Sequence, residues 1–527
     1  MKNNYRDNYY GSILDPLHGD IKLSEIEKWI ISQPIFTRLR KVKQNTFLYY
    51  VFPSANHTRF EHSIGVMHLA GKIFDSCKEN YATGQKKKEK YFIKGESSFF
   101  NLNLLDDLES IYYQELRLAA LLHDIGHGPL SHLFDEFAVS KDFFLLIVKD
   151  SSVLKKYYDG FDELIKTNKD KVEHEVISCA FIFLLIDELK KENIFNPNKF
   201  SQTVQYIISN ISAERIVKLI EPDFIQLQDY KDSNNNNYTL FFSRIISAFP
   251  IDADRMDYLL RDSYFSGVTY GIYDINRIFS SFMATADGKN VYLTYKESGL
   301  DSMLRFIQSR SHLYNQVYFH KTNRAANTML AYSSRSSKEN NFKLLDKSKD
   351  LETLKDFYIK NSDEVFLNYS IRKDVIKNDI EKEVLDELLN RKLFKRVYQV
   401  KIVLSDEYLT ESNIEEIKQI KNEIDAKLNT LIATNSIYAA SDLYQNNTFK
   451  ESDKKSVIIA IKKNKKYEFE EKWENVNKEF SIMNMNVIMV RIYIRRTFKD
   501  SVDYEAKRDI ILKTVLNETL KLEAYTK

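Results

Sequence analysis

The chain has 527 residues, of which 43% are hydrophobic and 29% are charged, and its formal net charge is +2. This length exceeds one compact core and predicts several domains, and the near-neutral charge gives no overall sign of a nucleic-acid partner. The only two cysteines, Cys77 and Cys179, exclude a disulfide framework and a four-cysteine zinc site. A polar N-terminal stretch and the lack of a long apolar run predict a cytoplasmic protein that does not bind a membrane.

Helices are predicted over most of the chain from about residue 25 to about residue 330, because glycine and proline are few. Helix periodicity is clearest over residues 59–77 and 114–126. The apolar residues that share one face of the first of these helices are Ile64, Met67, Ala70, Ile73 and Phe74. The polar stretches 84–90 and 232–238 are typical of solvated loops.

The pattern changes after about residue 335. Partly alternating, β-branched segments predict strands over residues 398–406, 456–464 and 485–496. A charged helix is predicted between them and the N-terminal part, over residues 372–396.

These segments divide the chain into two predicted parts. Residues 1–335 are expected to form a helical catalytic core, and residues 336–527 a smaller α+β lobe with a role in oligomerisation or regulation. The expected fold class is therefore mainly α.

Histidine is concentrated in one region of the chain. Seven of the ten histidines lie between positions 57 and 174, and "HDIGHGPLSH" alone contributes three of them. On a continuing helix, His127 would lie one turn after His123, and Gly128–Pro129 would then end that helix. His132 and Asp135 are expected on a new segment. Imidazole beside carboxylate is a ligand set for a divalent metal, so we expect distant segments to complete one site.

A structural role is the alternative for each of these residues. A single buried histidine is more often a hydrogen-bonded core residue than a ligand, which is the favoured interpretation for His57, His68, His312 and His320. The balance reverses at Asp124, because an ionised carboxylate on an apolar face requires a compensating cation or donor.

Motifs along most of the chain resemble those of HD-domain deoxynucleoside triphosphate triphosphohydrolases. The order His62, His123–Asp124 and Asp254 is similar to the H…HD…D signature of that family. The segments "DPLHGDIKLSE", "PIFTRLRKVKQ", "YYVFPSANHTRFEHSIGV" and "IDADRMDYLLRD" also resemble the family in order. The likeness is strongest to the vertebrate members that carry a SAM domain, and we expect this chain to lack that domain.

The resemblance implies a function and a set of roles. The family cleaves a dNTP between the α-phosphate and the 5′ oxygen, which releases a deoxynucleoside and inorganic triphosphate. The implied metal ligands are His62, His123, Asp124 and Asp254. The implied catalytic residues are His132 as general acid, Asp135 as its partner, and His127, His174 and Glu175 near the attacking water. The metal is divalent, and Fe, Mn, Zn and Mg all remain open.

The resemblance also implies substrate contacts. The residues matched to the phosphates are Arg59, Arg255, Tyr258 and Arg310, and those matched to the sugar are Gln44, Asn45, Asp262 and Tyr318. Asn45 replaces a leucine of the vertebrate members, so exclusion of a 2′ hydroxyl is less secure than hydrolysis itself. Asp252 is the next candidate ligand if Asp254 is not one, although its position before a helix also favours a capping role.

A regulatory nucleotide site is a further expectation from the resemblance. Arg40, His320 and Lys321 match family positions that bind an activating nucleotide between subunits of a homo-oligomer, a dimer or a tetramer. Ser32 replaces the residue that recognises guanine, and Gly11 and Leu14 replace two activator contacts. Guanine-specific activation is therefore not expected, and activation by another nucleotide or by none is left open.

Three functions are compatible with these residues. The leading one is hydrolysis of dNTPs, which would serve nucleotide-pool balance or antiviral defence. The second is an HD phosphohydrolase for another nucleotide, either an NTP or a signalling nucleotide. The third is a nucleic-acid-binding protein or nuclease, which the near-neutral charge does not indicate.

Overall fold

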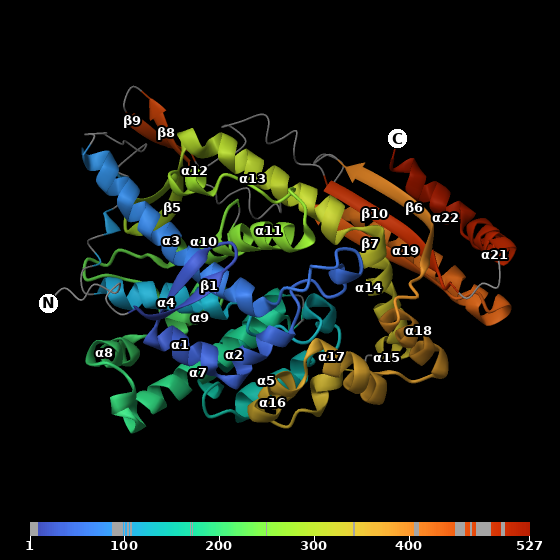
Figure 1. Cartoon of the computed structure of the whole chain (residues 1–527), viewed down its shortest axis with the longest axis horizontal. Helices are drawn as coiled ribbons and strands as arrows, with labels where there is room; N and C mark the ends of the chain where they lie inside the picture. The colour runs from blue at the N-terminus through green and yellow to red at the C-terminus, as the bar shows by residue number, and fades with distance from the viewer. Residues whose placement is uncertain are drawn as a thin grey trace.

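In the computed structural model, long helices pack around a buried centre and a smaller sheet lies at one end (Figure 1). The structure describes residues 9–86, 98–99, 101–102, 105, 108–168, 170, 172–248, 250–340, 343–404, 410–447, 459–463, 466–470, 486–496 and 501–526. No helix among these residues has the length and apolar character that crossing a bilayer requires.

The N-terminal part is mainly helical, as predicted. Its helices are α1 (Glu25–Ser32), α2 (Pro34–Thr37), α3 (Arg59–Lys86), α4 (Glu109–Leu122), α5 (Lys141–Asp150), α6 (Tyr158–Thr167), α7 (His174–Phe195), α8 (Gln202–Asn210), α9 (Ala213–Ile220), α10 (Thr239–Ile246), α11 (Ala253–Ser266), α12 (Ile275–Phe279), α13 (Leu300–Leu313) and α14 (Lys321–Ser333). The turn after α13, Tyr314–Tyr318, is a π-helix.

Helix α4 lies at the centre of this part. Its residues from Ile111 to Leu122 are all buried, and it packs against α3 and α9. The apolar face predicted for α3 is confirmed, because all five of its residues are at most 1% exposed. Each fully buried leucine or isoleucine contributes about 1.5–3 kcal/mol to folding. The packing of α3, α4 and α11 therefore holds the charged groups at their ends in fixed positions.

Two strand pairs of the N-terminal part were missed, and the second of them lies inside the region predicted as helical. They are the hairpin β1 (Tyr9–Asp15) and β2 (Gly19–Ser24), and the pair β4 (Phe282–Asp287) and β5 (Asn290–Lys296). The turn of the first pair, residues 16–18, lacks the dipeptides that most strongly signal a hairpin. Asp287–Gly288 at the turn of the second pair is such a signal, so the helical interpretation of residues 282–296 was wrong.

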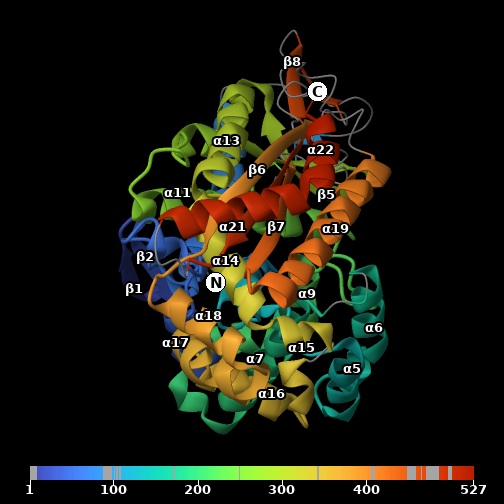
Figure 2. The ribbon, with the colours of Figure 1, turned by 90° about the vertical axis from the view of Figure 1, so that its right-hand side faces the viewer.

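The C-terminal part is α+β, as predicted. Its strands are β6 (Lys395–Leu404), β7 (Ala439–Asn447) and β10 (Asn486–Ile494), in the antiparallel order β6–β10–β7. Its helices are α15 (Arg335–Glu339), α16 (Leu351–Lys360), α17 (Asp363–Val365), α18 (Asp379–Leu389), α19 (Glu411–Asn435), α21 (Ser501–Thr514) and α22 (Leu516–Ala524). Figure 2 shows α19, α21 and α22 over one face of this sheet.

Alternation along the strands explains this packing. Val400 and Ile402 of β6 pair with Val490 and Ile488 of β10, and all four side chains enter a second hydrophobic core with α19, α21 and α22. This core is distinct from the main one, which includes residues up to Phe394 and also Tyr493 of β10. The division of the chain at residue 335 stays a prediction.

Further sheet contacts connect the two parts. The pair β4–β5 extends into the sheet β3–β4–β5–β8–β9, with β3 (Ser98–Phe99), β8 (Ile459–Lys463) and β9 (Lys466–Glu470). The strand predicted over 456–464 corresponds to β8, although 456–458 and 464 lie outside the described residues, as do 87–90 of the predicted loop 84–90.

Two predicted helices end differently from the sequence interpretation. The helix predicted over 372–396 is confined to α18, because a π-helix over Phe366–Val375 precedes it and β6 begins at Lys395. Helix α4 ends at Leu122, so His127 does not lie one helical turn after His123. Residues 123–126 form a turn instead, and Ser178 of α7 fixes it by donating to the His123 carbonyl (2.7 Å) and accepting from Gly126 N (2.8 Å).

Candidate active site

Four predicted metal ligands meet at the ends of three helices. His62 lies on α3, His123 caps the C-terminus of α4, Asp124 follows it, and Asp254 lies in the first turn of α11. The Asp254 Oδ1 atom is 3.1 Å from His62 Nε2 and 3.7 Å from His123 Nε2. Asp124 Oδ2 is 3.6 Å from His62 Nε2, and Asp124 Oδ1 is 3.4 Å from His123 Nε2. Side chains remote in sequence therefore converge on one point.

Both imidazoles present a nitrogen that has no hydrogen bond. His62 Nδ1 donates to Asp257 Oδ2 (2.8 Å) and His123 Nδ1 donates to the Ala120 carbonyl (2.8 Å). These bonds keep a proton on Nδ1, so Nε2 is the nitrogen of each ring that would bind a metal ion, which would displace any proton there. Within the described residues, both Nε2 atoms are buried without a hydrogen-bond partner.

The electrostatics of this cluster favour a positive charge. Burial disfavours a charge on His62, but the carboxylates of Asp254 and Asp257 raise its pKa to about 10. Although burial favours its neutral form, Arg59 and the neighbouring imidazoles hold the pKa of Asp124 well below its usual range. Two orphaned nitrogens and two ionised carboxylates fit a divalent ion, and this nitrogen–oxygen set accepts several metals.

Asp257 organises the cluster from behind, a role that the sequence analysis did not assign. It accepts from His62 Nδ1, from His18 Nε2 (2.7 Å) and from two nitrogens of Arg261 (2.8 and 2.9 Å). Arg261 also binds Asp15 at the end of β1 (2.9 Å), so the N-terminal hairpin supports this carboxylate. The spacing of Asp254 and Asp257, three positions apart on one helix, is the signal that could have indicated it.

A glycine makes room for Asp257. A β-carbon on Gly65 of α3 would lie 1.9 Å from Asp257 Oδ1 and 2.7 Å from Arg261 Nη2. Only glycine at this position lets α3 approach α11 closely enough for His62 to reach the carboxylate.

Three further histidines lie beside the cluster. His127 Nε2 is 3.4 Å from Asp124 Oδ1, and its ring stacks on His174 with centroids 3.5 Å apart. His132 is on the following short helix, and 69% of its side chain is exposed. The ligand atoms of these three histidines lie within 4.8 Å of one another. Because two of the rings face each other in near-parallel planes, one ion cannot lie in the plane of both.

Acids connect these histidines. Asp135 Oδ2 is 3.9 Å from His132 Nδ1 and 3.7 Å from His174 Nδ1, and His174 Nε2 is 3.1 Å from Glu175 Oε1. Burial opposes a charge on His174, but Asp135 and Glu175 raise its pKa to about 10. Asp135 thus contacts both histidines at ion-pair distance, as expected for a residue that orients them.

A cavity of about 300 Å³ opens next to this group. Predicted residues that line it are Gln44, Asn45, Arg59, His132, Tyr258, Asp262 and Tyr318. Further residues that line it are Thr46, Leu130, Ser131, Leu133, Tyr314, Phe319, Asn323, Arg324 and Asn327. In the described part of the chain, the side chains of Gln44 and Asn45 each have a buried polar atom without a hydrogen bond, Oε1 and Nδ2 respectively.

The other predicted substrate residues have partners in the protein. Tyr318 donates to Asp262 Oδ2, and Asp262 Oδ1 is 2.6 Å from His57 Nε2, which agrees with a structural role for His57. Arg310 donates to the Tyr258 hydroxyl (3.3 Å). Arg255 and Arg310 are outside the residues that line the cavity.

Arg255 is held by Asp252. Its Nη1 atom donates to Asp252 Oδ2, and its backbone N–H donates to Asp252 Oδ1 (2.7 Å). Asp252 thus caps α11, and the structural interpretation of this residue is confirmed.

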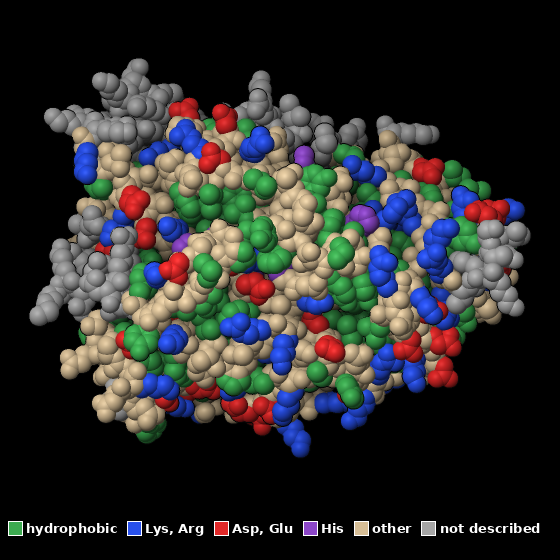
Figure 3. All heavy atoms as spheres, viewed as in Figure 1, with side chains coloured by type: hydrophobic (Ala, Val, Ile, Leu, Met, Phe, Trp, Pro, Cys, Tyr) green, Lys and Arg blue, Asp and Glu red, His purple; other side chains and the backbone are tan. Residues whose placement is uncertain are grey.

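The residues of the predicted regulatory site lie on different elements. The exposed Arg40 packs its guanidinium over the Phe60 ring, whereas His320 caps α14 by accepting from Thr322 N (3.3 Å) and Lys321 begins that helix. A nucleotide site built from these three residues stays a prediction. On the face in Figure 3, several basic side chains lie on the right, over the C-terminal elements, with acidic side chains beside them toward the right edge.

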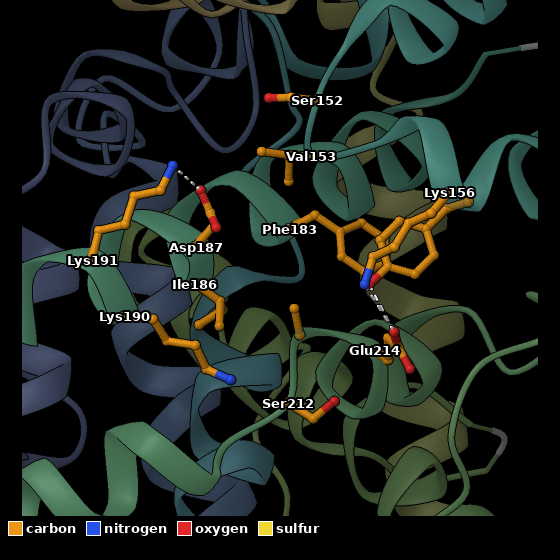
Figure 4. Close-up of a pocket in the computed structure, with 12 residues that line it drawn as sticks. Ser152, Val153, Lys156, Phe183, Ile186, Asp187, Lys190, Lys191, Ser212 and Glu214 are labelled. Carbon is orange, nitrogen blue, oxygen red and sulfur yellow. Dashed lines mark hydrogen bonds and ion pairs between the residues drawn. The ribbon is translucent and has the colours of Figure 1, made fainter. Parts of the chain in front are cut away.

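A second cavity, of about 440 Å³, lies between α7, α9 and residues 152–157 (Figure 4). Charged residues at its rim pair with one another, as in Lys191–Asp187 (2.7 Å) and Lys156–Glu214 (3.4 Å). Its residues on α7 run from Phe183 to Lys191, about 14–26 Å from His174 along the helix at 1.5 Å per residue. The smaller cavity beside the histidines is therefore the candidate active site.

Comparison with known proteins agrees with this geometry. A model of the HD domain matches residues 59–196, and a model of the HD-associated region matches residues 273–518. An uncharacterized protein of Methanocaldococcus jannaschii is 29% identical over 60% of this chain and 48% of its own. Two proteins named deoxynucleoside triphosphate triphosphohydrolases are also similar. These are the SAMHD1 homolog of Dictyostelium discoideum (27% identity, 78% of this chain, 65% of its own) and human SAMHD1 (26%, 73%, 54%).

The chain spans between about half and two thirds of the length of these relatives. The HD model covers His62, His123 and Asp124, and the HD-associated model begins after Asp254 and continues into the C-terminal sheet. The chain therefore belongs to the HD-domain proteins that carry an HD-associated region, and it is homologous to the SAMHD1 triphosphohydrolases.

Proposed function

We propose that the protein is a metal-dependent phosphohydrolase that converts a dNTP into a deoxynucleoside and inorganic triphosphate. The observation that carries this proposal is the junction of a four-residue His/Asp cluster with a cavity lined by arginine, histidine and amide side chains. The named activity of the SAMHD1 relatives gives it further support.

His62, His123, Asp124 and Asp254 would hold the divalent ion. When bound, the ion would supply positive charge at the α-phosphate and acidify a water molecule. The protein's own contribution is to fix the ligands, because Asp257 and the Ala120 carbonyl hold the two imidazoles by their Nδ1 atoms. Such supporting bonds set the orientation and basicity of ligand histidines.

The leaving group is the 5′ oxygen of the nucleoside, an alkoxide that needs a proton. We assign proton donation to His132, because it lines the cavity and is exposed to a ligand there. Asp135 lies between His132 and the positively charged His174, and Glu175 holds the far side of His174. This chain of charges would orient the imidazole toward the 5′ oxygen.

The triphosphate requires cations, and arginines are close to the cluster. Arg59 reaches both Asp124 and Ser131 at the cavity wall. We assign Arg59, Arg255, Arg310 and Tyr258 to the phosphates. To bind a phosphate, the Arg255 guanidinium would have to leave Asp252. A triphosphate favours this exchange, because its oxygens can accept several N–H groups.

The sugar would lie against Gln44, Asn45, Asp262 and Tyr318. Asp262 and Tyr318 already hold each other, so a 3′ hydroxyl would join an existing hydrogen-bond pair. The unpaired Nδ2 of Asn45 favours a second candidate activity, hydrolysis of NTPs, because this N–H group can donate to a 2′ hydroxyl.

Product analysis tests the proposal. The protein is stripped of metal and incubated with each dNTP and each NTP in the presence of Mg²⁺, Mn²⁺, Fe²⁺ or Zn²⁺. Inorganic triphosphate and deoxynucleoside in equal amounts support the proposal, and triphosphate from NTPs at similar rates supports the second candidate. Release of orthophosphate or pyrophosphate alone would refute cleavage at the 5′ oxygen.

A further inference from the structure

A carboxylate of the HD-associated region reaches into the wall of the candidate active site. Asp363 begins the short helix α17 and is 8% exposed. Its Oδ1 atom accepts from the backbone N–H of Leu130 (2.7 Å), and its Oδ2 atom accepts from the backbone N–H of Lys43 (2.9 Å). One side chain thus joins two loops that are remote from it in sequence.

Both loops lead directly into the cavity. Lys43 precedes Gln44 and Asn45, and Leu130 precedes Ser131 and His132. These are the residues assigned to the sugar on one side and to the proton donor on the other. Asp363 therefore fixes the spacing between the two walls.

The loop at Leu130 needs such support because of its backbone. Leu130 (φ 66°) and Ser131 (φ 55°) are consecutive residues in the left-handed region, which side chains other than glycine disfavour. The Leu130 N–H is held by Asp363, and its carbonyl accepts from Thr46 Oγ1 (2.7 Å). Both polar groups of the strained residue are thus held by side chains from outside its own loop.

The same connection continues to the metal cluster. Ser131 Oγ donates to the Lys43 carbonyl (2.7 Å) and accepts from Arg59 Nε (2.8 Å), and Arg59 binds Asp124. The two loops, the phosphate-side arginine and a proposed ligand therefore form one hydrogen-bonded unit that Asp363 closes.

We propose that Asp363 is a positioning residue that holds His132 at the distance from the bound nucleotide that proton transfer requires. This inference rests on the proposed function. It gives the HD-associated region an indirect part in catalysis, because the Asp363 carboxylate accepts from the backbone of the two loops that carry the cavity residues.

Asp363→Asn tests this role, because an amide keeps one acceptor and turns its NH₂ group toward the other N–H. A matched control is Asp346→Asn, since Asp346 also lies in the HD-associated region and accepts from a backbone N–H, that of Ser140 (2.7 Å). Ser140 is not among the residues that line the cavity. We expect kcat for a dNTP to fall about 10- to 100-fold in Asp363→Asn, as small displacements of catalytic groups do, with metal content unchanged and Asp346→Asn within two-fold of wild type.

A double-mutant cycle separates positioning from general damage. In a His132→Ala background, Asp363→Asn should lower kcat by less than three-fold, because the group that it positions is absent. An equal loss in both backgrounds, or a kcat for Asp363→Asn within two-fold of the control, would overturn the proposal.

A readout without activity distinguishes this inference from the proposed function. If wild type releases no triphosphate from any dNTP, the proposed function fails, and hydrogen exchange still tests the connection. Faster exchange of peptides 40–47 and 127–134 in Asp363→Asn than in Asp346→Asn would support it. Exchange equal to that of the control would refute it.

Discussion

Replacing Asp257 by asparagine removes a charge behind the metal cluster without touching a proposed ligand. The carboxylate accepts from four donors, which are His62 Nδ1, His18 Nε2, and Nε and Nη2 of Arg261. An amide can accept at one oxygen only, so its NH₂ group would face a donor. His62 would then lose the bond that keeps its proton on Nδ1.

Two effects of different size are expected. Loss of a supporting carboxylate behind a ligand histidine lowers metal affinity about 10- to 100-fold, which corresponds to about 1.4–2.7 kcal/mol. Breaking a buried ion pair such as Asp257–Arg261 also destabilises the fold by about 3–5 kcal/mol. Burial raises the pKa of Asp257, whereas the charge of Arg261 and the hydrogen bonds from His18 and His62 lower it. The net result is a pKa well below the usual range, so the carboxylate is charged at neutral pH.

Glu27→Gln is the matched control. Glu27 is also fully buried, and it also accepts from four donors, two of which are nitrogens of Arg117 (2.6 and 2.8 Å). The other two are the side chain of Gln114 (2.9 Å) and the backbone N–H of Ser24 (2.8 Å). It contacts neither imidazole of the metal cluster, so Glu27→Gln should lower stability while metal affinity stays within about three-fold of wild type.

Metal-stripped proteins titrated with Zn²⁺ under a competing chelator give the affinities, and scanning calorimetry gives the stabilities. We expect both variants to unfold at lower temperature and only Asp257→Asn to bind metal more weakly. Equal metal affinity in Asp257→Asn and wild type would refute the role of His62 as a ligand held by Asp257.

Three more outcomes follow from the structure. Gly65→Ala should destabilise the protein by about 1–3 kcal/mol and weaken metal binding, because its β-carbon would displace the Asp257 carboxylate. Gly11→Ala, whose β-carbon would lie in open space, should change neither the stability measured by calorimetry nor the metal affinity measured by titration. Asn45→Leu should lower turnover of NTPs relative to dNTPs about five-fold, the equivalent of one hydrogen bond of about 1 kcal/mol; an unchanged ratio of the two kcat/KM values would contradict contact with a 2′ hydroxyl. Burial and nearby carboxylates raise the pKa of Glu221 from 4.5 to about 8, so the folded state binds the extra proton and wild-type stability should decline as pH rises from about 4.5 to about 8. Glu221→Gln should therefore unfold at a higher temperature than wild type at pH 8, and this difference should disappear near pH 4.5. A difference in melting temperature that stays constant across this range would contradict the raised pKa of Glu221.

Sequence periodicity predicted the helical core well because the core helices are long and mostly buried. The apolar spacing in residues 59–77 identifies the face of α3 that packs inward, and it places His62 on this helix. The strands β6 and β10 were likewise recognisable, because β-branched residues alternate along them.

Local patterns could not place the end of α4. The turn after Leu122 is held by hydrogen bonds to Ser178, which lies more than fifty residues further along the chain. No sequence pattern near His123 indicates that contact. The short β1–β2 hairpin was missed for a similar reason, since its position depends on Asp15 binding Arg261 of α11.

The residues that meet at the metal cluster were predictable by type, whereas the residues that support them were not. An imidazole or a carboxylate in an apolar segment indicates a site by its own chemistry. Asp363 gives no such signal, because a carboxylate in the first turn of a helix is common. Only the fold shows that it holds the backbone at Lys43 and Leu130.

Anomalous diffraction from Zn²⁺-soaked crystals tests the central claim most directly. The account predicts the strongest peak about 2.0–2.2 Å from Nε2 of His62, Nε2 of His123 and one oxygen each of Asp124 and Asp254. A strongest peak among His127, His132 and His174, or no peak at either group, would contradict it.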